Sequence, residues 1–110
     1  LFVLPVAEAS LQVLGRAMPA GQIIGARGDH WNNHPSPKDP AAFRRFVDSY
    51  RARFNDYPIY PCHHMAQAFS ALQGAYAKAI AAKGGAWPND AELAAAFRGL
   101  TFPTPTSSIT

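Results

Sequence analysis

Residues 22–26 read Gln-Ile-Ile-Gly-Ala, and this stretch decides the fold that we predict. It is short, apolar and β-branched, and it lies between Gly21 and Gly28, a pattern typical of a buried parallel strand. Upstream, residues 1–4 read Leu-Phe-Val-Leu, a second run of strand character, and residues 7–17 carry apolar side chains at helical spacing. A strand, a helix and a strand in this order predict a βαβ unit, whose crossover helix covers one face of a parallel sheet.

Three helices are predicted downstream of this unit. Asp39 followed by Pro40 is a strong signal for a helix start, and an amphipathic aromatic stripe then continues to Phe54. A long alanine-rich helix is expected from about residue 61 to residue 83, where two glycines follow. A short helix at residues 89–98 begins with a capping-box pattern, and the remaining tail, rich in Thr and Pro, is expected to be extended.

The charged residues give little support to a nucleic-acid partner. The chain has 110 residues, enough for one domain, and a net charge of +3 at pH 7. An ion-pair ladder on a helix surface explains most of the basic excess more simply than a nucleic-acid face does. The residues concerned are Arg44, Arg45, Arg51 and Arg53, with Asp48 between them.

The ends of the sequence and its cysteine content are less informative. Cys62 has no second cysteine to pair with, so an internal disulfide is excluded. No apolar run reaches the roughly 20 residues that span a bilayer, so we expect no direct membrane insertion. The chain opens on an apolar run without a basic leader and stops within a segment of strand character. We therefore expect it to be a piece of a longer protein.

Three segments carry a family resemblance. Residues 50–58 read Tyr-Arg-Ala-Arg-Phe-Asn-Asp-Tyr-Pro, and residues 61–68 read Pro-Cys-His-His-Met-Ala-Gln-Ala. Residues 93–105 read Leu-Ala-Ala-Ala-Phe-Arg-Gly-Leu-Thr-Phe-Pro-Thr-Pro. In this order, after a glycine-bounded strand, they resemble the late C-terminal lobe of the leucine/isoleucine/valine-binding family of type I periplasmic solute-binding proteins. The family usually has a glycine soon after the Thr-Pro pair, where this chain has residues 106–108.

The resemblance implies an α/β fold in which residues 1–110 are a fragment of the C-terminal lobe of a two-lobed protein, a parallel sheet flanked by helices. It also implies a periplasmic component of an ABC importer, which binds a small molecule between the lobes and delivers it to the transporter permease. An amino acid is the default ligand of that family, and an aromatic acid or a short amide is a further expectation here. No catalysis and no cofactor are expected.

The first group of candidate ligand-binding residues is Asp29, His30 and Trp31. They lie in a polar loop that follows the predicted strand, where open α/β sheets bind ligands. Trp31 is expected to stack on a ligand and Asp29 to pair with its ammonium group. The alternative is structural: Trp31 packs on the rest of the lobe, and Asp29 makes a turn.

Tyr60 and His63 form the second group of candidates, at the start of the long helix. Free amide hydrogens and the positive end of the helix dipole favour a ligand carboxylate there. Alternatively, Tyr60 packs at the helix entrance and His63 faces solvent. The histidines offer no ligand set with metal-binding spacing, because His63 and His64 point about 100° apart on a helix. No metal site is therefore predicted.

Two other functions remain open. A ligand-sensing domain of a receptor or regulator would have the same fold and would differ only in the flanking segments. A small hydrolase would use Cys62 with His63 or His64, but residues adjacent in sequence rarely have the geometry of a nucleophile and its base. The sequence also lacks a nucleophile elbow, a phosphate-binding loop and a paired-carboxylate motif, so this function ranks last.

Overall fold

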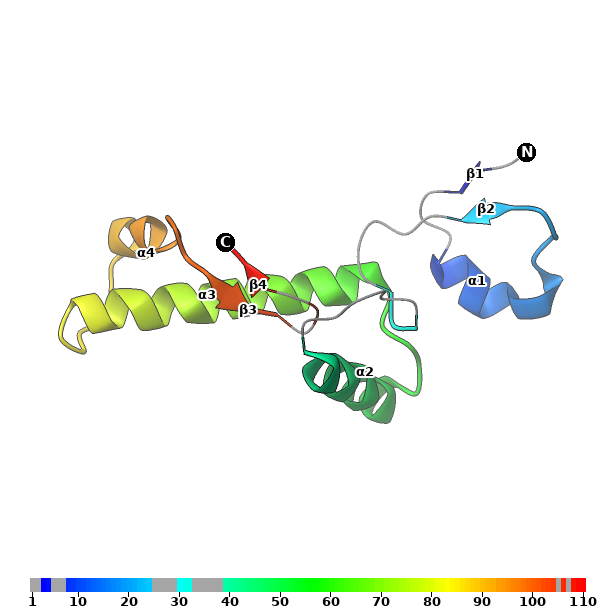
Figure 1. Cartoon of the computed structure of the whole chain (residues 1–110), viewed down its shortest axis with the longest axis horizontal. Coiled ribbons are helices and arrows are strands. Elements are labelled where there is room, and N and C mark those ends of the chain that lie inside the picture. The colour runs from blue at the N-terminus through cyan, green and yellow to red at the C-terminus, as the bar shows by residue number, and fades with distance from the viewer. Residues whose placement is uncertain (1–2, 5–7, 25–29, 33–38, 105, 107) are drawn as a thin grey trace.

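The longest element of the structure is an alanine-rich helix that lies along the long axis of the molecule (Figure 1). The structure is a computed structural model, and it describes residues 3–4, 8–24, 30–32, 39–104, 106 and 108–110. In chain order the elements are β1 (Val3–Leu4), α1 (Glu8–Leu14), a 3-10 turn (Gly15–Ala17), β2 (Ile23–Ile24), α2 (Pro40–Phe54), α3 (Tyr60–Ala82), α4 (Asp90–Ala96), β3 (Phe102–Pro103) and β4 (Ser108–Ile109).

The predicted start of α2 is confirmed. The Asp39 carboxylate accepts a hydrogen bond from the Ala42 amide at 2.8 Å, and Pro40 occupies the first turn. The helix ends where Asn55 adopts the left-handed conformation, with φ of 53°, and its amide donates to the Arg51 carbonyl at 2.8 Å. Asn tolerates this conformation better than most residues, so the chain turns sharply and reaches α3 within a few residues.

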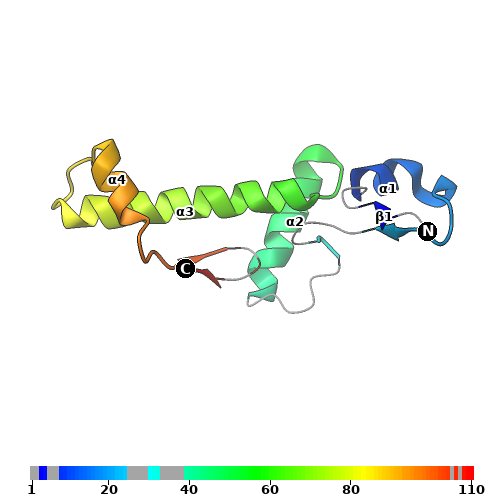
Figure 2. The ribbon, with the colours of Figure 1, turned by 90° about the horizontal axis from the view of Figure 1, so that it is seen from above.

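The hydrophobic core of the C-terminal half lies between α3 and α4. Ala75 and Ala79 of α3 are buried against Ala96 of α4, and Leu93 and Leu100 pack around them. Alanine side chains let the two helix backbones approach closely, which a larger residue would prevent. Figure 2 shows α4 lying against the C-terminal end of α3. The predicted short helix and its capping box are confirmed: the Asn89 side chain accepts from the Glu92 amide, and Glu92 accepts from the Asn89 amide.

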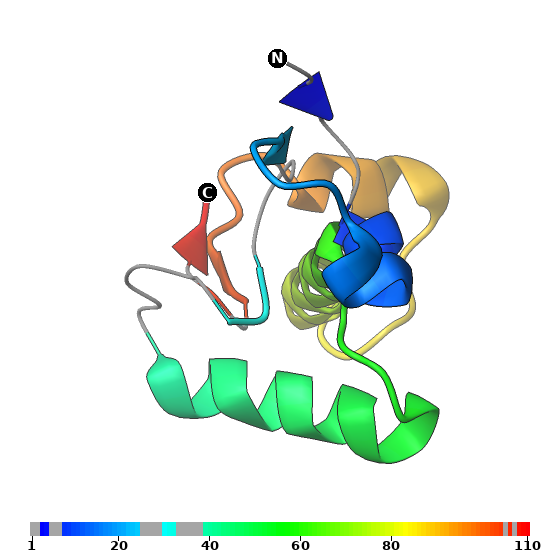
Figure 3. The ribbon, with the colours of Figure 1, turned by 90° about the vertical axis from the view of Figure 1, so that its right-hand side faces the viewer.

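The remaining elements give the molecule an elongated shape. Strands β3 and β4 pair antiparallel, with Phe102 opposite Ile109, and β3 packs on α3. Helix α2 lies across α3. In Figure 3, α3 is viewed down its axis and α2 is viewed from the side. The Cα radius of gyration is 17.7 Å. A compact chain of this length has a radius of gyration of about 13 Å. Much of the helix surface is therefore not covered by this chain.

The predicted parallel sheet flanked by helices is wrong. The described residues are mostly helical, and their extended pairings are two ladders of two residues per strand. A local βαβ unit does form, because β1 and β2 pair parallel with Val3 opposite Ile23. However, a sheet needs about three or more strands with an apolar face to be stable, and the sequence offers two short segments in this region. The downstream helices pack on one another instead.

Helix α1 also departs from its expected role. Its apolar side chains were expected to cover one face of the sheet, yet Leu11 and Leu14 are 39% and 47% exposed, and Val13 is 86% exposed. The side of α1 that faces the rest of the chain instead carries Glu8, which is 4% exposed, and the half-buried Gln12. Helix α1 therefore directs polar side chains inward, toward the site described next.

Candidate ligand-binding site

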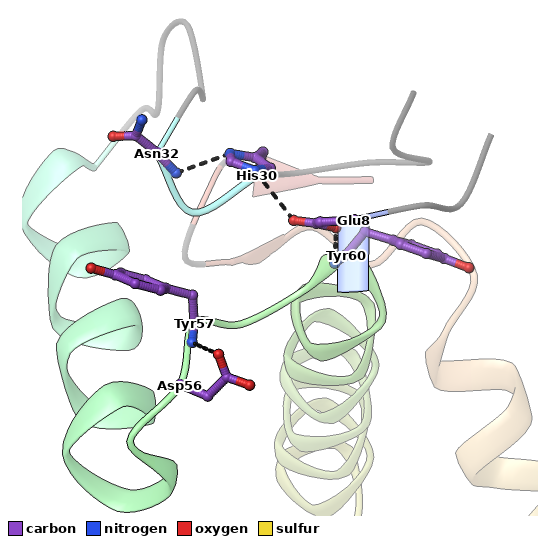
Figure 4. Close-up of polar contacts among 6 residues, drawn as sticks. All are labelled: Glu8, His30, Asn32, Asp56, Tyr57 and Tyr60. Atoms are coloured by element: carbon purple, nitrogen blue, oxygen red, sulfur yellow. Dashed lines mark hydrogen bonds and ion pairs between the residues drawn. The ribbon is translucent and has the colours of Figure 1, made fainter. Parts of the chain in front are cut away.

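Trp31 meets the segment that joins α2 to α3. Its ring stacks on that of Tyr57, with 3.8 Å between the centroids and 22° between the planes. The next ring is that of His30, 5.5 Å from Trp31. The His30 Nδ1 accepts a hydrogen bond from the Asn32 amide at 3.2 Å, which holds the loop in a tight turn (Figure 4). The loop that sequence reasoning selected thus lies against a second aromatic residue 26 positions further along the chain.

The sharp end of α2 determines where Tyr57 lies. After the left-handed Asn55, the Asp56 carboxylate accepts a hydrogen bond from the Tyr57 amide at 2.7 Å. The guanidinium carbon of Arg51, in the last turn of α2, lies 4.5 Å from the centre of the Tyr57 ring. An arginine at this distance from an aromatic ring makes a cation–π contact of about 0.5–1 kcal/mol at exposed sites. Tyr57 is therefore fixed by contacts with both the loop and α2.

These residues surround a cavity of about 610 Å³ between α1, the loop and the end of α2. Its volume lies within the range of about 300–1,000 Å³ that is usual for small-molecule sites. The walls combine two stacked aromatic rings with two charged groups of opposite sign and two side-chain amides. The described lining residues are Gln12, Trp31, Arg51, Ala52, Asn55, Asp56 and Tyr57.

Gln12 contributes a polar atom without a hydrogen-bond partner. Its Nε2 is buried and makes no hydrogen bond within the described part of the chain. Leaving a buried donor unpaired costs about 1–3 kcal/mol, so such atoms in folded proteins usually have a role or an additional partner. Gln12 also lines the cavity, but this nitrogen has almost no accessible surface and lies among atoms of the protein itself.

A buried carboxylate connects α1 to the start of α3 beside the cavity. The Glu8 Oε2 accepts a hydrogen bond from the Tyr60 amide at 3.0 Å, and the Glu8 Oε1 lies 3.4 Å from the His30 Nε2 (Figure 4). The amide at the start of α3, where we expected a ligand carboxylate, is thus already bound by a carboxylate of the chain itself. Glu8 instead holds the loop, α1 and α3 together.

The structure brings some of the predicted site residues together and separates others. His30, Trp31 and the backbone of Tyr60 lie at the cavity or next to it, whereas Asp29 lies outside the described residues. His63 is 1% exposed, and its ring centroid lies 5.8 Å from that of Phe43 and 4.9 Å from that of Phe46. The interpretation that His63 faces solvent is therefore wrong: its ring is part of the packing between α2 and α3.

Sequence reasoning missed Gln12, Arg51, Asp56 and Tyr57. Arg51 was assigned to an ion-pair ladder, but none of the α2 arginines forms an ion pair with Asp48 in the described structure. Tyr57 was considered only as part of residues 50–58, the segment that carries the family resemblance and in which the predicted helix ends. The one usable signal was the run of polar and aromatic residues at that helix end. It did not indicate that Trp31, far away in sequence, would lie against it.

The side chain that contacts Cys62 bears on the alternative function of a hydrolase, in which Cys62 would be the nucleophile. The Cys62 thiol and the Tyr50 hydroxyl form a hydrogen bond, with 3.5 Å between Sγ and the phenol oxygen. This hydrogen bond, together with burial and with the charge of Asp56, raises the pKa of Tyr50 to about 12. His64 contacts the Tyr60 ring instead, 5.4 Å between centroids. The polar partner of the thiol in the described structure is therefore a phenol, which is not a general base near neutral pH.

Among the described residues, no three His, Cys, Asp or Glu side chains lie close enough to share a metal ion. Within the same ranges, no helix combines the length and the apolar character needed to cross a bilayer.

Comparison of the whole chain with protein-family models, with curated proteins and with solved structures finds no match.

Proposed function

We propose that this chain is part of a periplasmic solute-binding component of an ABC importer. In this role it captures an amino acid, or a related amide or aromatic acid, between two lobes and presents it unchanged to the membrane permease. The observation that carries the proposal is the cavity of about 610 Å³ whose wall is the stacked pair of Trp31 and Tyr57. Stacked aromatic rings beside a few convergent polar groups are the usual composition of a small-molecule site.

The chemistry of the lining favours binding. The described lining residues offer stacking surfaces, a guanidinium, a carboxylate and two side-chain amides, and they include no cysteine, serine or histidine. These groups bind a polar solute by reversible contacts. Their arrangement at a junction of three segments also suits a protein whose lobes close around a ligand, because small movements of α1, the loop or α2 change the shape of the cavity.

The exposed face of α3 supports a role within a larger molecule. Met65, Phe69 and Leu72 are 56%, 64% and 38% exposed, and they follow the i, i+4, i+7 spacing of one helix face. A continuous apolar stripe of this kind is typical of a face that packs against more protein. In the proposed two-lobed protein, residues outside this chain pack against this face.

Binding is tested by titrating the protein with a panel of amino acids, amides and aromatic acids while tryptophan fluorescence is recorded. The chain has two tryptophans, so variants of each make a matched pair. Trp31→Ala should weaken binding of the best ligand by about 1 kcal/mol, roughly fivefold, through loss of a stacking contact. Trp87→Ala should leave binding unchanged, because Trp87 is 71% exposed and stacks on Tyr76, away from the cavity lining.

Mass spectrometry of the ligand recovered after a long incubation tests the absence of chemistry. We expect the recovered ligand to be unchanged. Conversion of the ligand, or failure of every compound in the panel to bind, would overturn the proposed function. Equal losses in the two tryptophan variants would remove this cavity from the binding site.

A further inference from the structure

The two ring nitrogens of His30 have different partners, and these partners fix where its proton lies. The Nδ1 accepts a hydrogen bond from the Asn32 amide at 3.2 Å, and the Nε2 lies 3.4 Å from the Glu8 carboxylate (Figure 4). Because a backbone amide only donates, the Nδ1 that accepts from it carries no proton. A carboxylate oxygen is an acceptor, so the proton of the ring lies on Nε2. The contacts are therefore those of one tautomer of the uncharged imidazole.

A second proton on the ring is compatible with only one of these two contacts. A protonated imidazole donates from both of its nitrogens. The contact with Glu8 persists, because its acceptor now faces a charged donor. At Nδ1, however, two N–H donors would face each other, so the hydrogen bond from the Asn32 amide is lost. Asn32 lies at an exposed position, where water can accept from its amide instead.

The turn that this hydrogen bond closes carries Trp31. The indole lies between the two bonded residues in the sequence and stacks on Tyr57 to form the wall of the cavity. A bond from a backbone amide to a side chain two residues earlier is the pattern of an Asx turn, and a nitrogen of His30 here replaces the usual Asn oxygen. Unlike that oxygen, a histidine nitrogen stops accepting when it gains a proton, a change that histidines ordinarily undergo between about pH 5 and 8.

The surroundings of the turn single out His30 as the group that responds to pH. Within the described residues, Glu8 of α1 is the titratable side chain in contact with its ring. The other charged or titratable side chains nearby contact Tyr57 or Tyr60 instead, and they are Arg51, Asp56 and His64.

We propose that His30 is a pH-sensitive switch for the wall of the cavity. With a neutral ring it closes the turn and holds Trp31 against Tyr57. With a protonated ring it opens the turn, while its contact with Glu8 keeps the loop attached to α1. The switch is a property of the chain itself, so it is tested without a solute. Its consequence, weaker binding of a solute in acid, rests on the proposed function.

The fluorescence of Trp31 reports the position of the switch in the full chain with the substitution Trp87→Phe, which leaves one tryptophan. Between pH 8.5 and pH 5.5 we expect the emission maximum to move to longer wavelength in a single one-proton transition, because the indole leaves Tyr57 and meets water. An emission maximum that stays constant over this range would overturn the proposal.

Two substitutions of His30 should lock the switch in its two positions. His30→Asn keeps an acceptor for the Asn32 amide that does not titrate, so the emission should remain at the wild-type value of pH 8.5. The longer side chain of His30→Gln places its amide group near the position of Nε2 instead, so the emission should remain at the value of pH 5.5.

His64→Gln is the matched control, because it removes an exposed histidine that contacts the Tyr60 ring, and it should keep the transition. A transition that persists in either His30 variant, or that His64→Gln removes, would contradict the role of His30.

Nitrogen NMR of the imidazole ring tests the position of the proton. At pH 8.5 the proton of His30 should lie on Nε2, and a proton on Nδ1 would rule out the switch. Far-ultraviolet circular dichroism should be the same at both pH values, and a loss of helix together with the fluorescence change would refute a local movement. If the transition appears but no solute binds, the switch stands and the proposed function fails.

Discussion

The carboxylate of Glu8 accepts a hydrogen bond from the backbone amide of Tyr60 at 3.0 Å, across 52 positions of the sequence. Glu8 is 4% exposed, so this contact is made away from water, where hydrogen bonds to charged groups are worth more than at the surface. It joins the first residue of α1 to the first residue of α3 and holds the wall of the cavity beside His30.

Removal of the Glu8 carboxylate should destabilise this junction. Glu8→Ala should lower the free energy of unfolding by about 1–3 kcal/mol, because the hydrogen bond to the Tyr60 amide is lost. Glu8→Gln keeps an acceptor oxygen, so it should lower the free energy of unfolding by less than Glu8→Ala does. Urea denaturation measures both changes, and Ser10→Ala, on an exposed position of α1, is the control. Equal effects of Glu8→Ala and Ser10→Ala would show that the contact adds no stability.

The hydroxyl group of Tyr50 should ionise at a higher pH than that of an ordinary tyrosine. Its hydrogen bond with Cys62 raises its pKa to about 12 in the folded protein, against an ordinary value of 10.0. Between pH 10 and 12 the unfolded chain therefore loses this proton while the folded chain keeps it. The stability that Tyr50 contributes is complete below pH 10 and is lost as the pH rises toward 12.

Ultraviolet difference spectroscopy of tyrosinate measures the titration. Of the four tyrosines of the chain, one should ionise about two pH units above the ordinary tyrosine pKa of 10.0. Tyr50→Phe should remove that step, and Cys62→Ala should move it toward pH 10. A late step that persists in Tyr50→Phe would contradict the assignment.

Substitution by alanine should change the free energy of unfolding in opposite directions at two glycines. A Cβ at Gly74 of α3 would meet Leu100 at 3.5 Å and Phe102 at 3.6 Å, which are ordinary contact distances, and alanine favours helix by about 0.5–1 kcal/mol. Gly74→Ala should therefore raise the free energy of unfolding. Gly99 has φ of 63°, where a side chain costs about 1–2 kcal/mol. Gly99→Ala should lower the free energy of unfolding, and an equal response of the two variants in urea would refute the argument.

The ion pair between α3 and α4 should weaken in acid. The Lys83 ammonium lies 2.6 Å from the Glu92 carboxylate, and this contact, with the Asn89 amide, holds the pKa of Glu92 below its usual 4.5. The contribution to stability is thus complete above pH 4.5 and is lost as the pH falls through the lower pKa of the folded state.

Amide hydrogen exchange of residues 90–96 measures this effect. Protection should decrease as the pH falls below 4.5 in the wild type after correction for the intrinsic exchange rate. Glu92→Gln retains an acceptor for the Asn89 amide and should show no such pH dependence. A wild type whose protection is independent of pH would argue against the ion pair.

The sequence by itself determined the local elements of this protein. Asp39 with Pro40, and Asn89 with Glu92, define helix starts because a cap is a contact between residues three positions apart. The spacing of apolar residues likewise gave the extent of α2 and α3. Interactions of this short range depend on neighbours in the chain, and the sequence displays those neighbours directly.

Only the tertiary structure decided which elements meet. The stack of Trp31 on Tyr57 and the contact of Glu8 with Tyr60 join segments tens of residues apart, and no periodicity encodes such a pairing. The same limit explains the wrong fold prediction, because strand character at residues 22–26 does not determine how many partners a strand finds. Long-range contacts depend on the packing free energy of the whole chain. The residues that line the cavity could therefore be identified as one group only from the folded structure.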